Sequence, residues 1–425
     1  LMAHYDPSNP STLFSNERRN SMSANQILII STLDTKGVET FYLKEKIESL
    51  GFSTILMDLS MRANVKMTAE ITNAHVADAG GSSIQEIGQS RERSKITKIM
   101  TSGASKLARQ YYDEGSIDGV IAMGGSTGTL MASEVMRCLP FGVPKTVISS
   151  TAALPGLSTR YIGTGDITLF HSVVEISGLS NLLKNVMDRA AHAITAMVHE
   201  TVTPLVTREG KALALTMLGP CEKCASFIRH ALEKEEYQVI GFSAAGVGDR
   251  AMEQMIAEGF FQGVIDLAPG GVGEHLFGFM RDAGPLRLEN AGRLGIPLIV
   301  STCSVNHMTP SKSRYQPEYH KRRKYDLDKF RTWIRLSPKE LQEVAQVFAV
   351  KLNKATGPVK VLIPQNGWSS VDQSGNPTHD PQEDRMFVEV LQKNLRPDID
   401  IVEVQANMED LTFARAVVKT ALELF

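Results

Sequence analysis

The stretch of sequence that decides the fold is Gly119-Val120-Ile121-Ala122-Met123-Gly124-Gly125-Ser126-Thr127-Gly128-Thr129. It opens with a short apolar run rich in strand-forming residues, and two glycines and several small hydroxyl residues follow. Residues 130–139 then have the pattern of a helix. A strand, a glycine-containing connection and a helix form the repeating unit of α/β proteins with parallel sheets, so this stretch predicts one such unit.

Units of the same kind lie on both sides of this stretch. Apolar runs at residues 27–32, 53–58 and 145–149 alternate with helical patterns, one of which spans residues 38–50 and ends at Gly51. This alternation predicts a parallel sheet with helices on its faces.

The second half of the chain repeats the plan of the first. Residues 119–125 have a counterpart in Gly263-Val264-Ile265-Asp266-Leu267-Ala268-Pro269-Gly270-Gly271, and residues 142–144 have one in Gly295-Ile296-Pro297. The matched segments lie closer together in the second half, so the first half carries an insertion before Gly119. We therefore predict an α/β protein of two Rossmann-like modules with mainly parallel sheets, facing each other across a cleft.

The predicted organisation has three parts. Residues 1–25 are a loosely ordered leader, residues 26–200 a first, nucleotide-binding module and residues 201–425 a second module. The linker is expected near residues 200–210, where Thr, Pro and Gly interrupt the periodicity. Further features are expected at residues 181–198 (helix), 311–329 (a basic excursion from the sheet), 359–363 and 400–404 (strands), and 410–424 (helix).

Composition limits the possible partners and location. Of 425 residues, 42% are apolar and 22% are charged, and the net charge is -2, so no overall field attracts nucleic acid or an anionic membrane. Four cysteines in a chain of this length favour a reducing compartment. Apolar runs are too short to cross a bilayer or to form a signal peptide, and the predicted location is the cytoplasm.

The connection after the predicted strand has the composition of a phosphate-binding loop. Gly124, Gly125 and Gly128 let a ligand approach the backbone, and the helix that follows presents free N–H groups and a partial positive charge. The hydroxyls of Ser126, Thr127 and Thr129 add donors or help to hold a hydrated magnesium ion. A tight turn with a Ser/Thr cap is the simpler alternative. The loop matches neither the Walker A pattern nor G-x-G-x-x-G.

Two other segments are expected at the same edge of the sheet. Asp34, Thr35 and Lys36 follow the first strand, and Ser150 and Thr151 follow the strand at residues 145–149. Ligands of open α/β sheets bind at the carboxyl ends of the strands. Lys36 is thus a candidate phosphate ligand and Asp34 a candidate partner of hydrated magnesium; a capped turn with a surface lysine is the alternative.

Asp166 is a further candidate for a metal or a ribose hydroxyl. It lies in Gly163-Thr164-Gly165-Asp166, and an ordinary turn aspartate is an equally good interpretation. Asp58, at the end of the second strand, is a weaker ribose candidate.

The sequence resembles a family of uncharacterised proteins that includes the ATP-binding N-terminal domain of the tomato mosaic-virus resistance protein. The match rests on residues 31–37 and 118–129, and on short groups of residues at 142–145, 351–355, 357–359, 363–364, 367–369, 372 and 380–381. It covers residues 26–425. The resemblance implies two Rossmann-like subdomains, ATP binding with magnesium in the first of them, and a homodimer.

The second module offers less specific candidates. Glu274 and His275 follow its glycine loop and could act as acid and base, although such a pair is more often a plain helix start. Polar residues that could line a second pocket are Ser301, Thr302, Asn306, His307, Ser369, Ser370, Asp372, His379, Asp380 and Asp384.

Two other patterns favour a structural interpretation. Cys221 and Cys224 have C-x-x-C spacing, but one such pair cannot complete a zinc site. The basic segment at residues 312–324 could contact RNA, bind an acidic ligand or close a dimer interface, and a solvated loop is the simplest interpretation.

We therefore predict a nucleotide-binding protein with ATP and Mg²⁺ as cofactors, without an assignable catalytic residue or a protein-built metal site. Two alternatives stay open: a small-molecule kinase or ligase whose substrate lies in the cleft, and a non-catalytic interaction protein that ATP stabilises.

Overall fold

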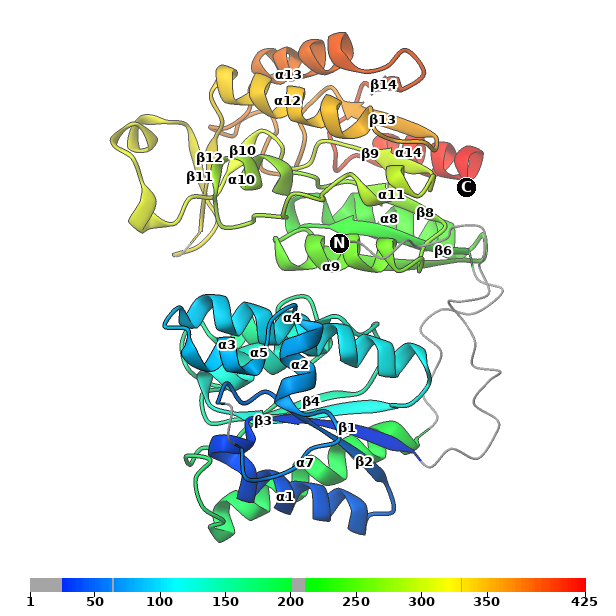
Figure 1. Cartoon of the computed structure of the whole chain (residues 1–425). Helices are drawn as coiled ribbons and strands as arrows, with labels where there is room; N and C mark the ends of the chain where they lie inside the picture. Colours follow the sequence, from blue (N-terminus) through cyan, green and yellow to red (C-terminus); the bar gives the residue numbers. More distant parts are fainter. Residues whose placement is uncertain (1–24, 63–64, 201–210, 330) are drawn as a thin grey trace. The chain divides into compact units, whose positions relative to one another are not determined.

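The computed structural model describes residues 25–62, 65–200, 211–329 and 331–425 (Figure 1). These residues divide into two compact units, one on each side of residues 201–210. Most of the predicted leader and the predicted linker lie outside the described residues. Among the helices that the structure describes, none combines the length and the apolar character needed to cross a bilayer.

The first unit is built on a five-stranded parallel sheet. Its spatial order is β2-β1-β3-β4-β5, and Ile29 of β1 lies opposite both Leu56 of β2 and Ile121 of β3. The strands are β1 (Gln26–Ser31), β2 (Ser53–Asp58), β3 (Gly119–Gly124), β4 (Lys145–Ser149) and β5 (Thr168–His171). The central strands β1 and β3 are buried on both faces, which is why they appear in the sequence as continuous apolar runs.

Helices cover both faces of this sheet (Figure 1). Helices α1 and α7 share one apolar core with it, and α2, α4 and α5 share the other. The helices are α1 (Leu33–Ser49), α2 (Asn73–Ala79), α3 (Ile84–Gln89), α4 (Arg93–Asp113), α5 (Ser126–Arg137), α6 (Ser158–Ile162) and α7 (Asn181–His199). The chain leaves β1 toward β2 and leaves β3 toward β4, so the strand order reverses between β1 and β3. Such a switch point is where open α/β sheets bind ligands.

The second unit is built on a six-stranded parallel sheet in the order β14-β13-β9-β8-β6-β7, with a small antiparallel sheet, β10-β12-β11, beside it. The strands are β6 (Lys211–Met217), β7 (Tyr237–Ser243), β8 (Gly263–Asp266), β9 (Leu298–Val300), β10 (His307–Met308), β11 (Lys324–Asp326), β12 (Thr332–Arg335), β13 (Val359–Pro364) and β14 (Asp400–Val404).

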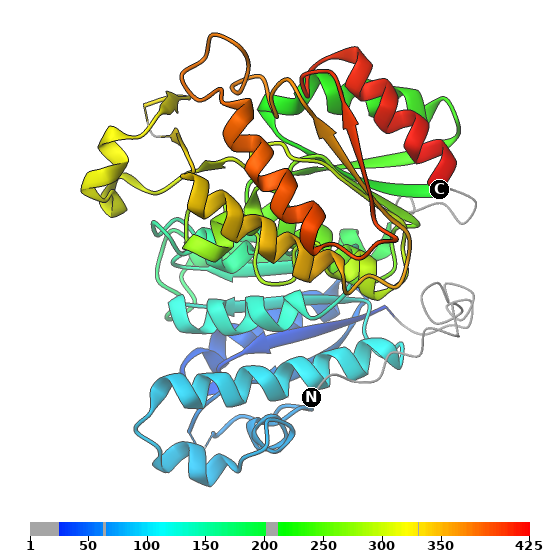
Figure 2. The ribbon, with the colours of Figure 1, turned by 90° about the horizontal axis from the view of Figure 1, so that it is seen from above.

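Helices also pack on both faces of the six-stranded sheet. Helices α12 and α13 run side by side within the larger core, and α8 and α14 share the opposite core (Figure 2). The helices are η3 (Gly219–Cys221), α8 (Glu222–Glu233), α9 (Val247–Ala257), α10 (Gly271–Phe277), α11 (Asn290–Arg293), η4 (Lys312–Arg314), η5 (Pro317–Lys321), α12 (Pro338–Leu352), α13 (Pro381–Asn394) and α14 (Leu411–Leu424).

The two α/β units with mainly parallel sheets confirm the predicted fold class. The predicted insertion before Gly119 is also confirmed, because α2, α3 and α4 lie between β2 and β3 where the second unit has α9 alone. One helix start was wrong, because α5 begins at Ser126 rather than at residue 130. Helix α1 begins at Leu33 but is broken at Lys36 (φ -127°, ψ 17°), so its predicted start at residue 38 lies just after the break. Residues that are poor in a helix interior are tolerated in the first turn, where backbone N–H groups have no intrahelical partner in any case.

Candidate functional site

The N-terminus of α5 presents three backbone N–H groups without a partner. Gly125 is its N-cap in extended conformation (φ -80°, ψ -162°), and the first helical bond runs from the Thr129 N–H to the Gly125 carbonyl at 2.9 Å. No hydrogen bond of the described residues uses the N–H groups of Ser126, Thr127 or Gly128. Ser126 is exposed, so these donors can be reached from solvent. The helix dipole adds partial positive charge at this point.

The neighbouring helix α1 differs at its N-terminus, because side chains of the protein itself accept its first N–H groups. The Asp58 carboxylate accepts the Leu33 N–H at 3.0 Å, and the Ser60 hydroxyl oxygen accepts the Asp34 N–H at 2.9 Å. The next two N–H groups bond to the Thr32 carbonyl. Burial raises the pKa of Asp58, which is only 2% exposed, while its hydrogen bonds to Ser60 and Leu33 oppose that rise. Asp58 therefore caps α1 instead of facing a ribose.

The glycine loop of the second unit is also filled by the protein. A Cβ atom on Gly270 would lie 2.3 Å from the Ser304 hydroxyl oxygen, and one on Gly271 would lie 2.5 Å from the Cβ of Ala283. These glycines let neighbouring chain segments pack closely. Among the three helix starts compared, only that of α5 has both open space and unused donors in the described residues.

The glycines of the first loop differ in what requires them. A Cβ on Gly124 would lie 3.0 Å from the backbone nitrogen of Thr129, so packing requires this glycine. A Cβ on Gly125 would lie 3.9 Å from the Ser150 hydroxyl oxygen, and one on Gly128 would lie 4.0 Å from the Met123 carbonyl. Both distances are ordinary contacts, and neither residue has a positive φ. Gly125 and Gly128 thus leave open space that the fold does not use.

This difference predicts opposite effects of alanine at two glycines. Gly124→Ala is expected to lower the free energy of unfolding by roughly 1–3 kcal/mol, because the new methyl group presses on backbone atoms. Gly128→Ala is expected to raise it by roughly 0.5–1 kcal/mol, because alanine favours the helix. Urea denaturation of both variants measures the difference. A loss for Gly128→Ala as large as that for Gly124→Ala would show that the fold itself requires the second glycine.

Lys36 and Ser150 lie beside the α5 N-terminus, joined by Glu175. The Lys36 ammonium donates to the Ile176 carbonyl and lies 3.5 Å from the Glu175 carboxylate. The same carboxylate accepts the Ser150 hydroxyl at 3.4 Å. A cation, a hydroxyl and the unused N–H groups therefore lie close to one another. Glu175 was missed from the sequence, since it lies in a loop about 50 residues after Gly125 and belongs to no recognisable motif.

Two predicted hydroxyls brace the site from behind. The Thr129 hydroxyl is fully buried, and its oxygen lies 3.1 Å from the Gly124 carbonyl oxygen and 2.8 Å from the Ser149 hydroxyl, so its one hydrogen can bond to either. The Thr151 hydroxyl bonds to that of Tyr161 at 2.7 Å. Thr129 thus holds the ends of β3 and β4 together, and Thr151 ties the end of β4 to α6, so both support the site without facing a ligand.

Asp34 and Thr35 lie at the carboxyl end of β1, next to that of β3. The Asp34 carboxylate is 3.7 Å from the Arg62 guanidinium, and Thr35 is exposed with its hydroxyl 2.9 Å from that of Thr32. Within the described ranges no group of three or more His, Cys, Asp or Glu side chains is arranged to hold a metal ion. Magnesium at this edge would therefore depend on oxygen ligands from a bound phosphate.

Asp166 does not join this group. It precedes β5, so it lies at the amino edge of the sheet, opposite the α5 N-terminus. Its carboxylate pairs with Lys145 at 2.7 Å and accepts the Gly142 N–H at 2.7 Å. Asp166 thus ties down the start of β4, and we withdraw it as a ribose or metal candidate.

The candidate acid and base of the second unit are each held by a neighbouring side chain. Glu274 is buried and pairs with Arg281 at 2.8 Å, and His275 lies 2.8 Å from Asp282.

Burial raises the pKa of the Cys224 thiol well above its ordinary value, which is the opposite of what a reactive C-x-x-C pair needs.

Part of the predicted polar set in the second unit forms one buried network. Asn306 donates to Asp372 at 2.7 Å and to Asp384 at 3.0 Å, and Arg335 donates to Asp384 at 2.7 Å. Burial, reinforced by the nearby Asp372, raises the pKa of Asp384 to about 8, and burial lowers the pKa of His307 to about 3. Arg335 was not predicted from the sequence.

Two arginines of the basic excursion of the second unit are held in ion pairs. Arg322 pairs with Glu318 and Glu340 at 2.9 and 2.6 Å, and Arg323 pairs with Asp380 and Glu383 at 2.8 and 2.5 Å. These pairs leave less free positive charge for an RNA contact.

Comparison with known proteins matches both units to one family. The N-terminal domain of an uncharacterised protein family (UPF0261) matches residues 25–203, and its C-terminal domain matches residues 210–425. A UPF0261 protein of Clostridium tetani is 33% identical over 94% of this chain and 98% of its own length, and one of Brucella suis is 31% identical over 92% and 93%. The ToMV resistance protein Tm-1(GCR237) of Solanum lycopersicum is 33% identical over 77% of this chain and 44% of its own length. With both of its units matched, the chain belongs to the uncharacterised protein family UPF0261.

Proposed function

We propose that the first unit binds a phosphorylated ligand at the N-terminus of α5, with ATP and Mg²⁺ as the leading candidates. The observation that carries the proposal is the contrast between helix starts: Asp58 and Ser60 fill that of α1, whereas no group in the described part of the chain bonds to the N–H groups of Ser126, Thr127 and Gly128. A phosphate at this point accepts those three donors and the partial positive charge of the helix.

The surroundings favour an anion that carries its own counter-ion. Lys36 supplies one positive charge, and Glu175 lies 3.5 Å from it. A bare polyphosphate would meet the Glu175 carboxylate, so a magnesium-bound phosphate chain fits this balance of charge better. The family resemblance read from the sequence points to ATP, and an adenine nucleotide is therefore the first ligand to test.

The chemistry that we propose is limited to binding. A kinase or ligase needs a catalytic base, for which the sequence offers Asp34, Asp166 and His275. Asp166 lies at the opposite edge of the sheet, and His275 belongs to the second unit and is held by Asp282. Asp34 alone stays near the α5 N-terminus, 3.7 Å from Arg62. A non-catalytic ATP-stabilised protein is thus the better-supported alternative. The homodimer and the cytoplasmic location stay predictions.

A thermal-shift series tests the proposal. ATP with Mg²⁺ at one hundred times its dissociation constant is expected to stabilise the protein by about 2.7 kcal/mol, which is an increase in Tm of roughly 5–10 °C. ADP, tripolyphosphate and inorganic phosphate, each with and without Mg²⁺, show which part of the ligand is bound. No increase with any of these anions would contradict a phosphate site.

A turnover assay separates binding from catalysis. We expect stabilisation by ATP with ADP release no faster than the uncatalysed background. ADP release that depends on an added metabolite would support a kinase or ligase instead.

A further inference from the structure

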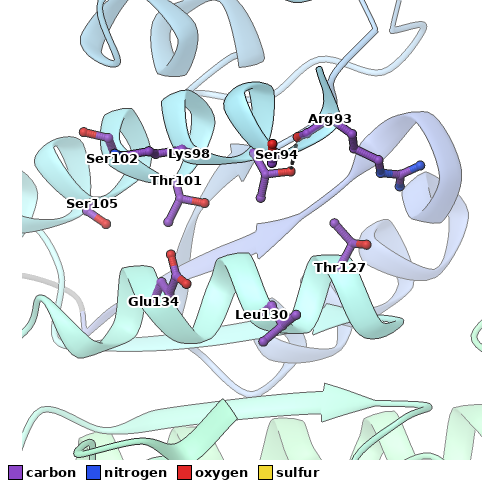
Figure 3. A pocket seen from close by; sticks show the side chains of 10 residues that line it. Arg93, Ser94, Lys98, Thr101, Ser102, Ser105, Thr127, Leu130 and Glu134 are labelled. Carbon is purple, nitrogen blue, oxygen red and sulfur yellow. Dashed lines mark hydrogen bonds between the residues drawn. The ribbon is translucent and has the colours of Figure 1, made fainter. Parts of the chain in front are cut away.

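A groove of about 710 Å³ lies between α4 and α5 and reaches the proposed phosphate site (Figure 3). Thr127 lines it, and the N–H group of the same residue is one of the unused donors of α5. The volume is within the range of about 300–1,000 Å³ that small-molecule sites occupy. The hydroxyl side chains that line the groove are Ser94, Thr97, Thr101, Ser102, Ser105 and Thr127.

One end of the groove lies beside the phosphate site. Ser105 lies at its far end, where the Cys138 thiol donates to the Ser105 carbonyl at 3.3 Å and ties α5 to α4. Arg93 and Thr127 lie at the other end, as Figure 3 shows. A ligand whose phosphate is bound at the α5 N-terminus can therefore extend into the groove.

Positive charge is concentrated at the end of the groove near Arg93 and Thr127. Both α4 and α5 begin there, and neither of these described helices has an acidic residue in its first turn. Arg93 is the first residue of α4, a position where a cation is unfavourable beside the helix dipole. The N-cap residue Glu92 makes no capping hydrogen bond. An anion bound at this end would offset the positive charge of Arg93 and of the two helix N-termini.

Thr101 supplies an independent indication of a ligand inside the groove. Its side chain projects from α4 toward α5 in Figure 3, the residue is only 5% exposed, and its hydroxyl has no hydrogen-bond partner among the described residues. A helical threonine commonly donates to its own helix, as Thr97 does to the Arg93 carbonyl at 2.8 Å. Buried hydroxyls are almost always satisfied, so this one calls for a partner from outside the chain.

The lining selects the class of ligand. No aromatic side chain lines the groove, and Leu130 is its one large apolar residue, so a flat base has nothing to stack on. Six hydroxyls, the Lys98 ammonium and the Glu134 carboxylate instead suit a ring that carries many hydroxyl groups. We propose that the α4–α5 groove binds the sugar ring of a phosphate ester whose phosphate lies at the α5 N-terminus. This inference rests on the proposed function for the position of the phosphate.

The sugar has two possible sources, the ribose of a nucleotide or a free monosaccharide phosphate. Titration calorimetry with ribose 5-phosphate, AMP, glucose 6-phosphate and inorganic phosphate compares them. Ribose 5-phosphate is expected to bind at least about fivefold more tightly than inorganic phosphate, because the ring adds two or more hydrogen bonds. The tighter of AMP and glucose 6-phosphate identifies the source.

Thr101→Val tests the groove, because valine keeps the shape and removes the hydroxyl. The variant is expected to bind ribose 5-phosphate about 2- to 10-fold more weakly, the loss of one hydrogen bond, with its affinity for inorganic phosphate unchanged. Without ligand it is expected to melt roughly 2–4 °C higher, because an unsatisfied buried hydroxyl is gone. Thr195→Val is the matched control: Thr195 is also helical and 5% exposed, but its hydroxyl bonds to the Ala191 carbonyl at 2.9 Å. The control should keep the ligand preference.

Two results would overturn the groove assignment: equal affinity for inorganic phosphate and ribose 5-phosphate in the parent protein, or an undiminished preference in Thr101→Val. In both cases the phosphate site can stand. Conversely, binding of free ribose or glucose that Thr101→Val weakens, without binding of any phosphate, would retain the groove and remove the proposed function.

Discussion

Gly125→Asp is expected to abolish nucleotide binding while leaving the ligand-free protein at least as stable as the parent. Gly125 is an N-cap in extended conformation without a side-chain cap, and aspartate is among the best residues at such a position. The new carboxylate would accept the N–H groups of Thr127 or Gly128, which are the donors that a phosphate needs. The loss of affinity for ATP with Mg²⁺ is expected to be on the order of 100-fold, measured by titration calorimetry.

Gly125→Asn is the matched control for this variant. Asparagine caps a helix as well as aspartate does but carries no charge. Its side-chain oxygen should accept the same N–H groups, but ATP binding should weaken less, because the neutral amide does not repel the phosphates. Unchanged ATP affinity in Gly125→Asp, with intact folding, would place the ligand elsewhere.

Arg287→Met is expected to lower the free energy of unfolding by about 3–5 kcal/mol. Arg287 is fully buried in the second unit, 3.0 Å from Asp249, 2.6 Å from Asp266 and 3.7 Å from Glu253. Without the guanidinium these buried carboxylates lose the cation that compensates them. Denaturant unfolding at pH 8 measures the loss. Arg385→Met, which breaks an exposed pair with Glu403, is the control and should cost no more than about 1 kcal/mol.

The deficit of Arg287→Met should grow with pH. Burial raises the pKa of Glu253 to about 7 even though Arg287 opposes that rise. The ordinary value is 4.5, so the native state binds more protons than the unfolded state between about pH 4.5 and pH 7, and this group makes the parent protein less stable as the pH rises through that window. Removing Arg287 raises the pKa of Glu253 further. The native state of the variant therefore loses most stability at higher pH, where the buried carboxylate must be deprotonated without its cation. A deficit that is equal at pH 5 and pH 8 would contradict this account.

The sequence was sufficient for the central strands of both sheets because these strands are buried on two faces, whereas the edge strands β5 and β7 were not predicted. Residues 27–30 and 120–123 are apolar without interruption, and only a central strand of a parallel sheet needs that pattern. The internal repeat then located the equivalent strands of the second unit. The small sheet of β10, β11 and β12 was not predicted, since its strands have only two to four residues.

The site was only partly readable from the sequence. The glycine stretch lies between a strand and a helix as predicted. Which of its glycines face open space, however, depends on neighbours such as Ser150 that follow other strands. The edge on which Asp166 lies depends on β5, a four-residue strand with exposed ends that has no apolar signature. Glu175, Arg287 and Arg335 are charged residues whose burial or position is set by tertiary packing alone, and nothing in their local sequence distinguishes them from surface residues.

The most direct test of the phosphate site is the response of individual backbone amides to ATP with Mg²⁺ in a ¹⁵N-resolved NMR titration. The account predicts that the largest shifts fall on Ser126, Thr127 and Gly128, whereas the amides of Leu33 and Asp34, which Asp58 and Ser60 already occupy, move little. Shifts that spare residues 126–128, or that centre on the start of α1, would contradict it.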